Sequence, residues 1–137
     1  MTDEPPETSA RNPADVMPFA RLMGIQVTEA GPQAIRATLV VREELCTTGG
    51  IVHGGALMAF ADALGAIGAF VTLPDGAKGT TTIESKTNFL GPGPLGSTLV
   101  AETTPVKTGR TLSVWQTRIR TDRGRDVALV TQTQMVL

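Results

Sequence analysis

The first apolar stripe of the chain predicts a short helix over residues 13–23. Apolar side chains recur there at the i, i+3, i+4, i+7 spacing of one helical face, namely at Val16, Phe19, Ala20 and Met23. Asn12 followed by Pro13 is typical of an N-cap and a first helical position, and Gly24 is a typical stop. Residues 1–12 are acidic and contain proline, which predicts a disordered tail rather than a signal peptide.

Alternating patterns on both sides of the chain's centre predict β-strands. Residues 25–30 and 33–41 alternate β-branched with polar side chains around a Gly31-Pro32 break, which is typical of a hairpin. From residue 80 onward, β-branched residues dominate. Turn-forming sequences divide this part into four long strands. These turns lie at residues 91–96, 107–110 and 123–126.

The segment 54–71 is apolar on all sides and predicts a helix enclosed by protein. Its only charged residue is Asp62, and ten of its 18 residues are Gly or Ala, which lets a neighbour pack close to the backbone. A membrane span of this length would hold an unpaired aspartate at mid-depth. The order of elements predicts the α+β class, with one antiparallel sheet wrapped around one long central helix in a single domain over 13–137.

Composition narrows the possible functions. A net charge of −1, from 12 basic and 13 acidic residues, provides no field that attracts nucleic acid or an anionic membrane, so neither partner is expected. The single Cys46 forms no internal disulfide, and a single histidine leaves too few ligands for zinc. Phosphate-loop, dinucleotide and nucleophile-elbow signatures are absent. We therefore expect a cytoplasmic protein that uses no metal and no cofactor.

The stretch GGIVHGGALMAFAD, residues 49–62, carries the candidate chemistry. Gly54 and Gly55 at a helix start leave backbone N–H groups open, and the helix dipole favours negative charge there, so the stretch predicts an oxyanion site. The alternative is a helix cap without chemistry. Asp62 has no Lys or Arg between residues 43 and 77 to pair with, which is typical of a base or nucleophile. Its alternative role is that of a partly exposed, solubilising residue.

The spacing of these two candidates has a consequence for assembly. Gly54 and Asp62 lie eight residues apart, which is about 12 Å along one helix, so one chain cannot bring both to the same substrate carbon. If both are catalytic, two antiparallel chains must place Asp62 of one beside Gly54 of the other. A catalytic role therefore predicts a homodimer with two equivalent sites.

The pattern of residues also carries a family resemblance. HGG, an aspartate seven residues after its second glycine, the strand sequence TIESKTNFLGPGPLGSTLVAE and the hairpin KTGRTLSV resemble the hotdog-fold acyl-CoA thioesterases of the phenylacetate-pathway (PaaI-like) group. The likeness runs from Met17 to Val136. It implies a sheet wrapped around a central helix, dimers that often pair into a homotetramer, and hydrolysis of acyl-CoA thioesters.

Carried onto this sequence, the resemblance implies roles for five residues. Gly54 supplies the oxyanion N–H, and His53 orients that loop or contacts the thioester. Asp62 of the partner chain acts as nucleophile or as general base, and Thr82 positions the attacking water beside it. Many relatives carry Asn six residues before the histidine, where this chain has Thr47. Either Thr47 holds the water or thioester less firmly, or a neighbour replaces it.

Further candidates concern substrate binding. Gly55 belongs to the same helix start, and Met58 lines an acyl pocket with Phe19 and Met23 unless these side chains serve only as core. Cys46 beside His53 is an alternative nucleophile, although inert packing is more common. Basic residues at the expected hairpin turns either hold the phosphates of CoA or are simply solvated. These residues are Lys107, Arg110, Arg123 and Arg125.

The leading prediction is a thioesterase that hydrolyses a small or medium acyl-CoA, aromatic acyl groups included, to the free acid and CoA. One alternative, motivated by Thr47, is a noncatalytic acyl-CoA-binding or regulatory hotdog module. The other is an enoyl-CoA hydratase or dehydratase on the same fold. That activity calls for a histidine with a carboxylate inside the helix, whereas His53 precedes it.

Overall fold

The computed structural model describes residues 12–137, so the tail predicted over 1–12 lies outside the described residues except for Asn12. The first half of the chain contains the 3-10 turn η1 (Pro13–Val16), α1 (Pro18–Met23), β1 (Gln26–Ala30), β2 (Ile35–Val40), the 3-10 turn η2 (Glu43–Leu45), β3 (Cys46–Thr47) and β4 (Ile51–Val52). The second half contains α2 (Gly54–Val71), β5 (Thr80–Phe89), β6 (Thr98–Thr108), β7 (Leu112–Thr121) and β8 (Asp126–Val136).

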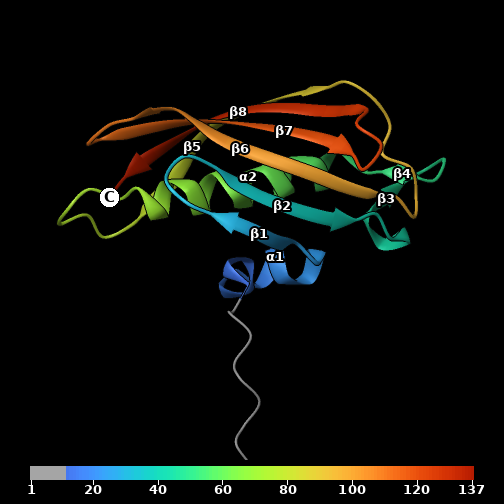
Figure 1. Cartoon of the computed structure of the whole chain (residues 1–137), viewed down its shortest axis with the longest axis horizontal. Coiled ribbons are helices and arrows are strands. Elements are labelled where there is room, and N and C mark those ends of the chain that lie inside the picture. The colour runs from blue at the N-terminus through green and yellow to red at the C-terminus, as the bar shows by residue number, and fades with distance from the viewer. Residues whose placement is uncertain (1–11) are drawn as a thin grey trace, which may run out of the picture.

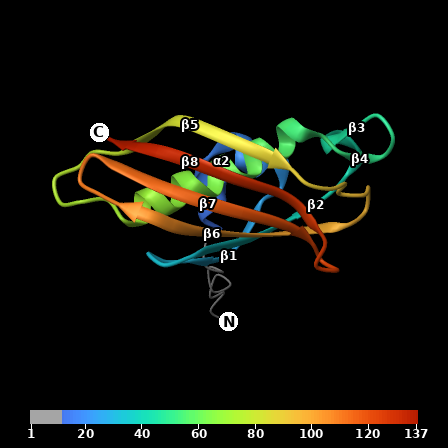
Figure 2. The ribbon, with the colours of Figure 1, turned by 90° about the horizontal axis from the view of Figure 1, so that it is seen from above.

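Six of the strands form one antiparallel sheet in the order β1-β2-β6-β7-β8-β5. The sheet curves around α2, which lies along its inner face, while α1 lies below β1 and β2 (Figure 1). Seen from above, β5 and β1 form the two edges of the sheet (Figure 2). The predicted α+β class, with an antiparallel sheet wrapped around one long helix, is confirmed.

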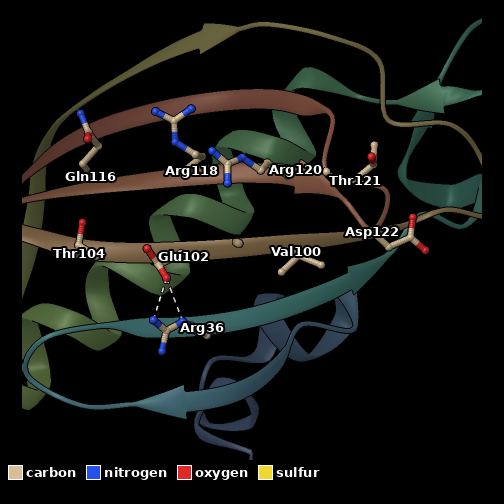
Figure 3. A pocket seen from close by; sticks show the side chains of 11 residues that line it. Arg36, Val100, Glu102, Thr104, Gln116, Arg118, Arg120, Thr121 and Asp122 are labelled. Carbon is tan, nitrogen blue, oxygen red and sulfur yellow. Dashed lines mark hydrogen bonds and ion pairs between the residues drawn. The ribbon is translucent and has the colours of Figure 1, made fainter.

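The sheet separates an apolar inner face from a polar outer face. On β7 the side chains of Trp115, Thr117 and Ile119 are fully buried. Their neighbours Arg118 and Arg120 point to the outer face, where they line a hollow of about 570 Å³ on the side of the sheet away from α2 (Figure 3). Period-two alternation in the sequence therefore assigns the two faces of this strand correctly.

The predicted helix over 13–23 is wrong in its middle. The structure has η1 and α1 in its place, separated by Met17 in an extended conformation (φ −101°, ψ 107°). The ring of Pro18 disfavours helical geometry at the preceding residue, so the first turn ends there and a new helix begins. The predicted ends are confirmed, because the Asn12 side chain accepts a hydrogen bond from the N–H of Ala14 and Gly24 has a φ of 86°.

The long helix α2 spans the predicted residues, Gly54–Val71. Its length and mean hydropathy of 1.6 would suffice for a membrane span, but half of it is buried inside the protein, as is typical of a core helix. Two of its glycines allow close packing. A Cβ at Gly65 would lie 2.2 Å from Cδ of Gln132, and a Cβ at Gly68 would lie 2.8 Å from the ring of Trp115. The expectation that a neighbour approaches the helix backbone is confirmed.

Candidate active site

A tight hairpin leads the chain into the start of α2. Strands β3 and β4 pair Thr47 with Ile51, and the turn between them contains Gly49 and Gly50, both with positive φ. The following residue, His53, is the N-cap of α2, and its Nδ1 accepts a hydrogen bond from the N–H of Gly55 at 2.8 Å. Because Nδ1 is the acceptor, the neutral ring carries its proton on Nε2.

The N–H of Gly54, a half-buried residue, is the unoccupied donor at this helix end. It donates to no acceptor within residues 12–137, whereas the N–H of Gly55 is occupied by His53. Phe89, at the end of β5, lies against this residue, since a Cβ at Gly54 would be 3.1 Å from Cε1 of the ring. Of the two glycines singled out by sequence, Gly54 is therefore the one whose N–H is available to a ligand.

Asp62 lies two turns further along α2 and is partly exposed. Oγ1 of Thr82, on β5, donates a hydrogen bond to Oδ1 of Asp62 at 2.7 Å. The hydroxyl oxygen of Thr82 in turn accepts from Nε2 of Gln134 at 2.6 Å, across the β5–β8 pair in which these two residues face each other. The structure thus brings together Asp62 and Thr82, and it adds Gln134, which sequence analysis did not identify.

Several other sequence candidates lie apart from these groups. Thr47 is exposed on β3 and makes no side-chain hydrogen bond within the described residues. Met58 is exposed on α2, between Gly54 and Asp62. Lys107, expected in a turn, lies instead in β6 opposite Val114, whereas Arg110 belongs to the turn between β6 and β7, and both are exposed.

The basic residues of the turns are divided between the two ends of α2. Arg110 lines a cleft with Asp75, just beyond the C-terminus of the helix. By contrast, Arg123 and Arg125 line a cleft of about 700 Å³ beside the loop 91–97. That loop contacts β4, which leads directly into Gly54. Within one chain, Arg123 and Arg125 of the β7–β8 hairpin are therefore the turn arginines near the N-terminus of α2.

A further cleft of about 390 Å³ lies between α1 and the start of α2. His53 and Gly55 line it, together with Phe19, Met23 and the partly buried Cys46. Sequence analysis missed Arg42, which also lines this cleft and whose guanidinium donates to backbone carbonyls at the end of α1. The only sequence signal for Arg42 is its position as the last basic residue before the stretch without Lys or Arg.

The outer hollow of the sheet holds a separate group of charges (Figure 3). Hydrogen bonds with Glu29 and Glu102 raise the pKa of Arg36. On the neighbouring strands, the hydrogen bond from Arg120 lowers the pKa of Asp126. None of the residues selected from the sequence as candidate site residues lines this hollow. Across residues 12–137, no group of three or more His, Cys, Asp and Glu side chains is placed to hold a metal ion.

Comparisons with known proteins show the family of this chain. The sequence pattern of the thioesterase superfamily matches residues 49–128. The Mycobacterium tuberculosis protein Rv1847 is 33% identical over 113 residues, which cover 82% of this chain and 81% of the relative.

Many solved structures are similar as well, and two serve as examples. The thioesterase HI1161 of Haemophilus influenzae is 28% identical, with a TM-score of 0.80, and the match covers 87% of this chain and 82% of that one. A "hypothetical thioesterase protein" of Streptococcus pneumoniae, solved with coenzyme A, is 25% identical, with a TM-score of 0.75. That match covers 82% of this chain and 87% of the other.

Proposed function

Because the chain belongs to the thioesterase superfamily and is a thioester hydrolase of the hotdog fold, we propose that it hydrolyses acyl-CoA thioesters to the free acid and CoA through Gly54 and Asp62. The similar Streptococcus pneumoniae structure with coenzyme A supports CoA as the thiol. The observation that carries the proposal is the pairing of an unoccupied N–H at the start of α2 with a carboxylate held by Thr82.

The Gly54 N–H is the proposed donor to the thioester carbonyl oxygen. At the first turn of an 18-residue helix, this donor is fixed in direction and reinforced by the helix dipole. As the carbonyl carbon becomes tetrahedral, negative charge develops on the oxygen that the N–H contacts. His53 fixes the geometry of this turn through Gly55, and its Nε2–H remains available as a second donor.

The carboxylate comes from a second copy of the chain, because Gly54 and Asp62 of one copy are about 12 Å apart along α2. The edge strand β5 supports a homodimer. Within the described residues it pairs only with β8, and it exposes 53% of Ile83 and 56% of Phe89. An exposed apolar edge is a ready surface for pairing. Antiparallel pairing of two β5 strands lays the two α2 helices side by side in opposite directions and makes both sites equivalent. A homotetramer is then a pair of such dimers.

In this arrangement Asp62 of the second copy acts on water or on the thioester carbon itself. As a general base, it takes a proton from water while the water oxygen bonds to the carbonyl carbon, and the CoA thiolate then leaves. As a nucleophile, it bonds to the carbonyl carbon and displaces the CoA thiolate, and water then opens the resulting acyl anhydride. In single-turnover hydrolysis in ¹⁸O-labelled water, label in the Asp62 carboxylate identifies the nucleophilic route with water attack at the aspartyl carbon, because general-base hydrolysis labels only the free acid.

Substrate contacts follow from the clefts at the same end of the molecule. The 390 Å³ cleft beside His53, lined by Phe19 and Met23, suits a small or medium acyl group, aromatic groups included. Arg123 and Arg125 are the proposed contacts for CoA phosphates from the same chain. Lys107 and Arg110 reach the site only from the second copy, whose antiparallel helix extends past the first copy's Gly54.

Thiol release from a panel of alkyl and aryl acyl-CoAs, measured for wild type and Asp62→Asn, tests this function. Asparagine keeps the acceptor oxygen for Thr82 but cannot act as a base. We expect hydrolysis by the wild type and a loss of at least about 10²-fold in kcat for the variant. Equal rates would reject the role of Asp62. Tight binding without turnover would instead identify a noncatalytic binding module, and loss of enoyl absorbance with an enoyl-CoA would identify a hydratase.

A further inference from the structure

A buried chain of hydrogen bonds links the backbone of α2 to the Asp62 carboxylate by way of two strands. Nε2 of Gln132 donates to the carbonyl of Ala61 at 2.9 Å. Nε2 of Gln134 donates to Oε1 of Gln132 at 2.8 Å and to Oγ1 of Thr82 at 2.6 Å. Thr82 donates to Oδ1 of Asp62 at 2.7 Å. This series of hydrogen bonds therefore starts at Ala61 and ends at Asp62, which are adjacent residues of the same helix.

The direction of every bond in this chain follows from its first member. A backbone carbonyl only accepts, so Gln132 must turn its amide nitrogen toward Ala61 and its oxygen toward Gln134. Gln134 must then present its nitrogen, and its two hydrogens go to Gln132 and Thr82. With its oxygen accepting from Gln134, the hydroxyl of Thr82 directs its single hydrogen at Asp62. The hydroxyl group is thus held as a donor to the carboxylate.

This arrangement is costly for the fold, which argues against simple core packing. Gln132 is 1% exposed and Gln134 is 0% exposed, and Oε1 of Gln134 is buried without a partner among the described residues. An unpaired buried oxygen typically costs about 1–3 kcal/mol. Turning the Gln134 amide over would place that oxygen against the oxygen of Gln132, so donation to Thr82 prevails. Gly65 supplies the space, because any side chain there would overlap the Gln132 amide.

We propose that Gln134, supported by Gln132, is a positioning residue that holds Oδ1 of Asp62 through Thr82 and leaves Oδ2 as the oxygen that reacts. This inference rests on the proposed function of Asp62. Neither glutamine is exposed, so neither contacts substrate. Without the donor at position 134, the Thr82 hydroxyl turns freely and the carboxylate spends less time in the reactive orientation. The turnover rate then falls while substrate binding is unchanged.

Gln134→Met tests this role, because methionine keeps the volume and removes the donor. We expect kcat to fall about tenfold with KM within about twofold of wild type. Thr117→Val is the matched control. It breaks a buried hydrogen bond of 2.6 Å, to Thr103 on the neighbouring strand, without touching the Asp62 chain. We expect its kcat to stay within about twofold of wild type.

A double-mutant cycle identifies the route of the effect. If Gln134 acts through Thr82, Gln134→Met causes no further fall in kcat once Thr82→Val is present. Thr82→Ser, which keeps the hydroxyl, should restore kcat to near the wild-type value. Equal losses from Gln134→Met in both Thr82 backgrounds, or an equal loss from Thr117→Val, would overturn the proposal in favour of a general packing role.

The positioning role and the proposed function fail in distinguishable ways. If Asp62→Asn loses turnover and Gln134→Met keeps kcat within about twofold of wild type, the positioning role alone is wrong. If Asp62→Asn is as active as wild type, the proposed function is wrong. The hydrogen-bond chain is then tested by the side-chain amide signals of Gln134 in a ¹H–¹⁵N spectrum. A shift of these signals in Thr82→Val supports the bond direction, and unchanged signals contradict it.

Discussion

At the N-terminus of α2, the proposed substrate contact is a backbone N–H, whereas two turns further along the proposed reacting group is the side chain of Asp62. The Gly54 N–H is held in place by the helix itself and needs no support beyond the His53 cap. The Asp62 carboxylate rotates about two bonds, and a chain through Thr82 to two buried glutamines holds it. A backbone donor is fixed by secondary structure, while a side-chain base needs a supporting network.

The largest effect is expected where the backbone donor is removed. Proline is tolerated at the first position of a helix and has no N–H, and His53 already has the extended conformation (φ −66°, ψ 137°) that a residue before proline adopts. We expect Gly54→Pro to lower kcat about 10²–10³-fold, as measured by thiol release from the best acyl-CoA.

Gly54→Ala is the matched control for this change. It introduces the same Cβ contact with Phe89, at 3.1 Å, but keeps the N–H. We expect its kcat to remain within about fivefold of wild type. If the alanine and proline variants lose activity equally, the contact with Phe89 matters and the backbone donor does not.

A smaller effect on kcat is expected when the hydrogen-bond network that holds the Asp62 side chain is disturbed. The two close-packed glycines of α2, Gly65 and Gly68, test this effect. Gly65→Ala displaces the far end of Gln132, which cuts the hydrogen bond to Ala61. The gain in helix propensity, about 1 kcal/mol, offsets the loss of that bond. We expect kcat to fall about tenfold with little change in Tm, measured by thiol release and by thermal unfolding.

Gly68→Ala should show the opposite pattern. Its Cβ meets the fully buried ring of Trp115, which cannot move aside, so overpacking costs about 1–3 kcal/mol of unfolding free energy. Although Trp115 lies opposite Gln132, its indole N–H donates to Ser113 and it makes no hydrogen bond in the network that holds Asp62, so kcat should be retained. If both alanine variants reduce stability and turnover together, the distinction between network and packing is lost.

The smallest effect is expected at the exposed ion pair between Arg120 on β7 and Asp126 at the start of β8. Because the hydrogen bond from Arg120 lowers the pKa of Asp126, this carboxylate stabilises the fold above its unfolded-state pKa. That contribution is lost as the pH falls through the folded-state pKa. Asp126→Asn should lower Tm slightly at about pH 7, and this difference from wild type should shrink as the pH is lowered. A larger Tm difference in acid than at neutral pH would contradict this assignment.

The local parts of the molecule could be predicted from the sequence. The limits of α2 and the face alternation of β7 follow from short-range patterns, and so do the candidates Gly54, His53 and Asp62. The break before Pro18 is also local, but the apolar stripe through residues 13–23 conceals it.

The long-range parts could not be predicted in the same way. Gln132 and Gln134 alternate along an ordinary strand, and only the register that sets Gln134 opposite Thr82 gives them a partner. The division of the turn arginines between the ends of α2 depends on which hairpin lies beside β4, which is a property of sheet topology. The buried polar chain is therefore visible only once strands distant in sequence are paired.

The central claim is that each site takes Gly54 from one copy of the chain and Asp62 from another, and subunit complementation tests it most directly. Gly54→Pro and Asp62→Asn chains, each inactive alone, are co-expressed so that mixed dimers form. Each mixed dimer contains one site with both groups intact, so random pairing should restore about a quarter of wild-type activity. If the mixture stays as inactive as its components although mixed dimers are present, the two groups do not act across copies and the account is wrong.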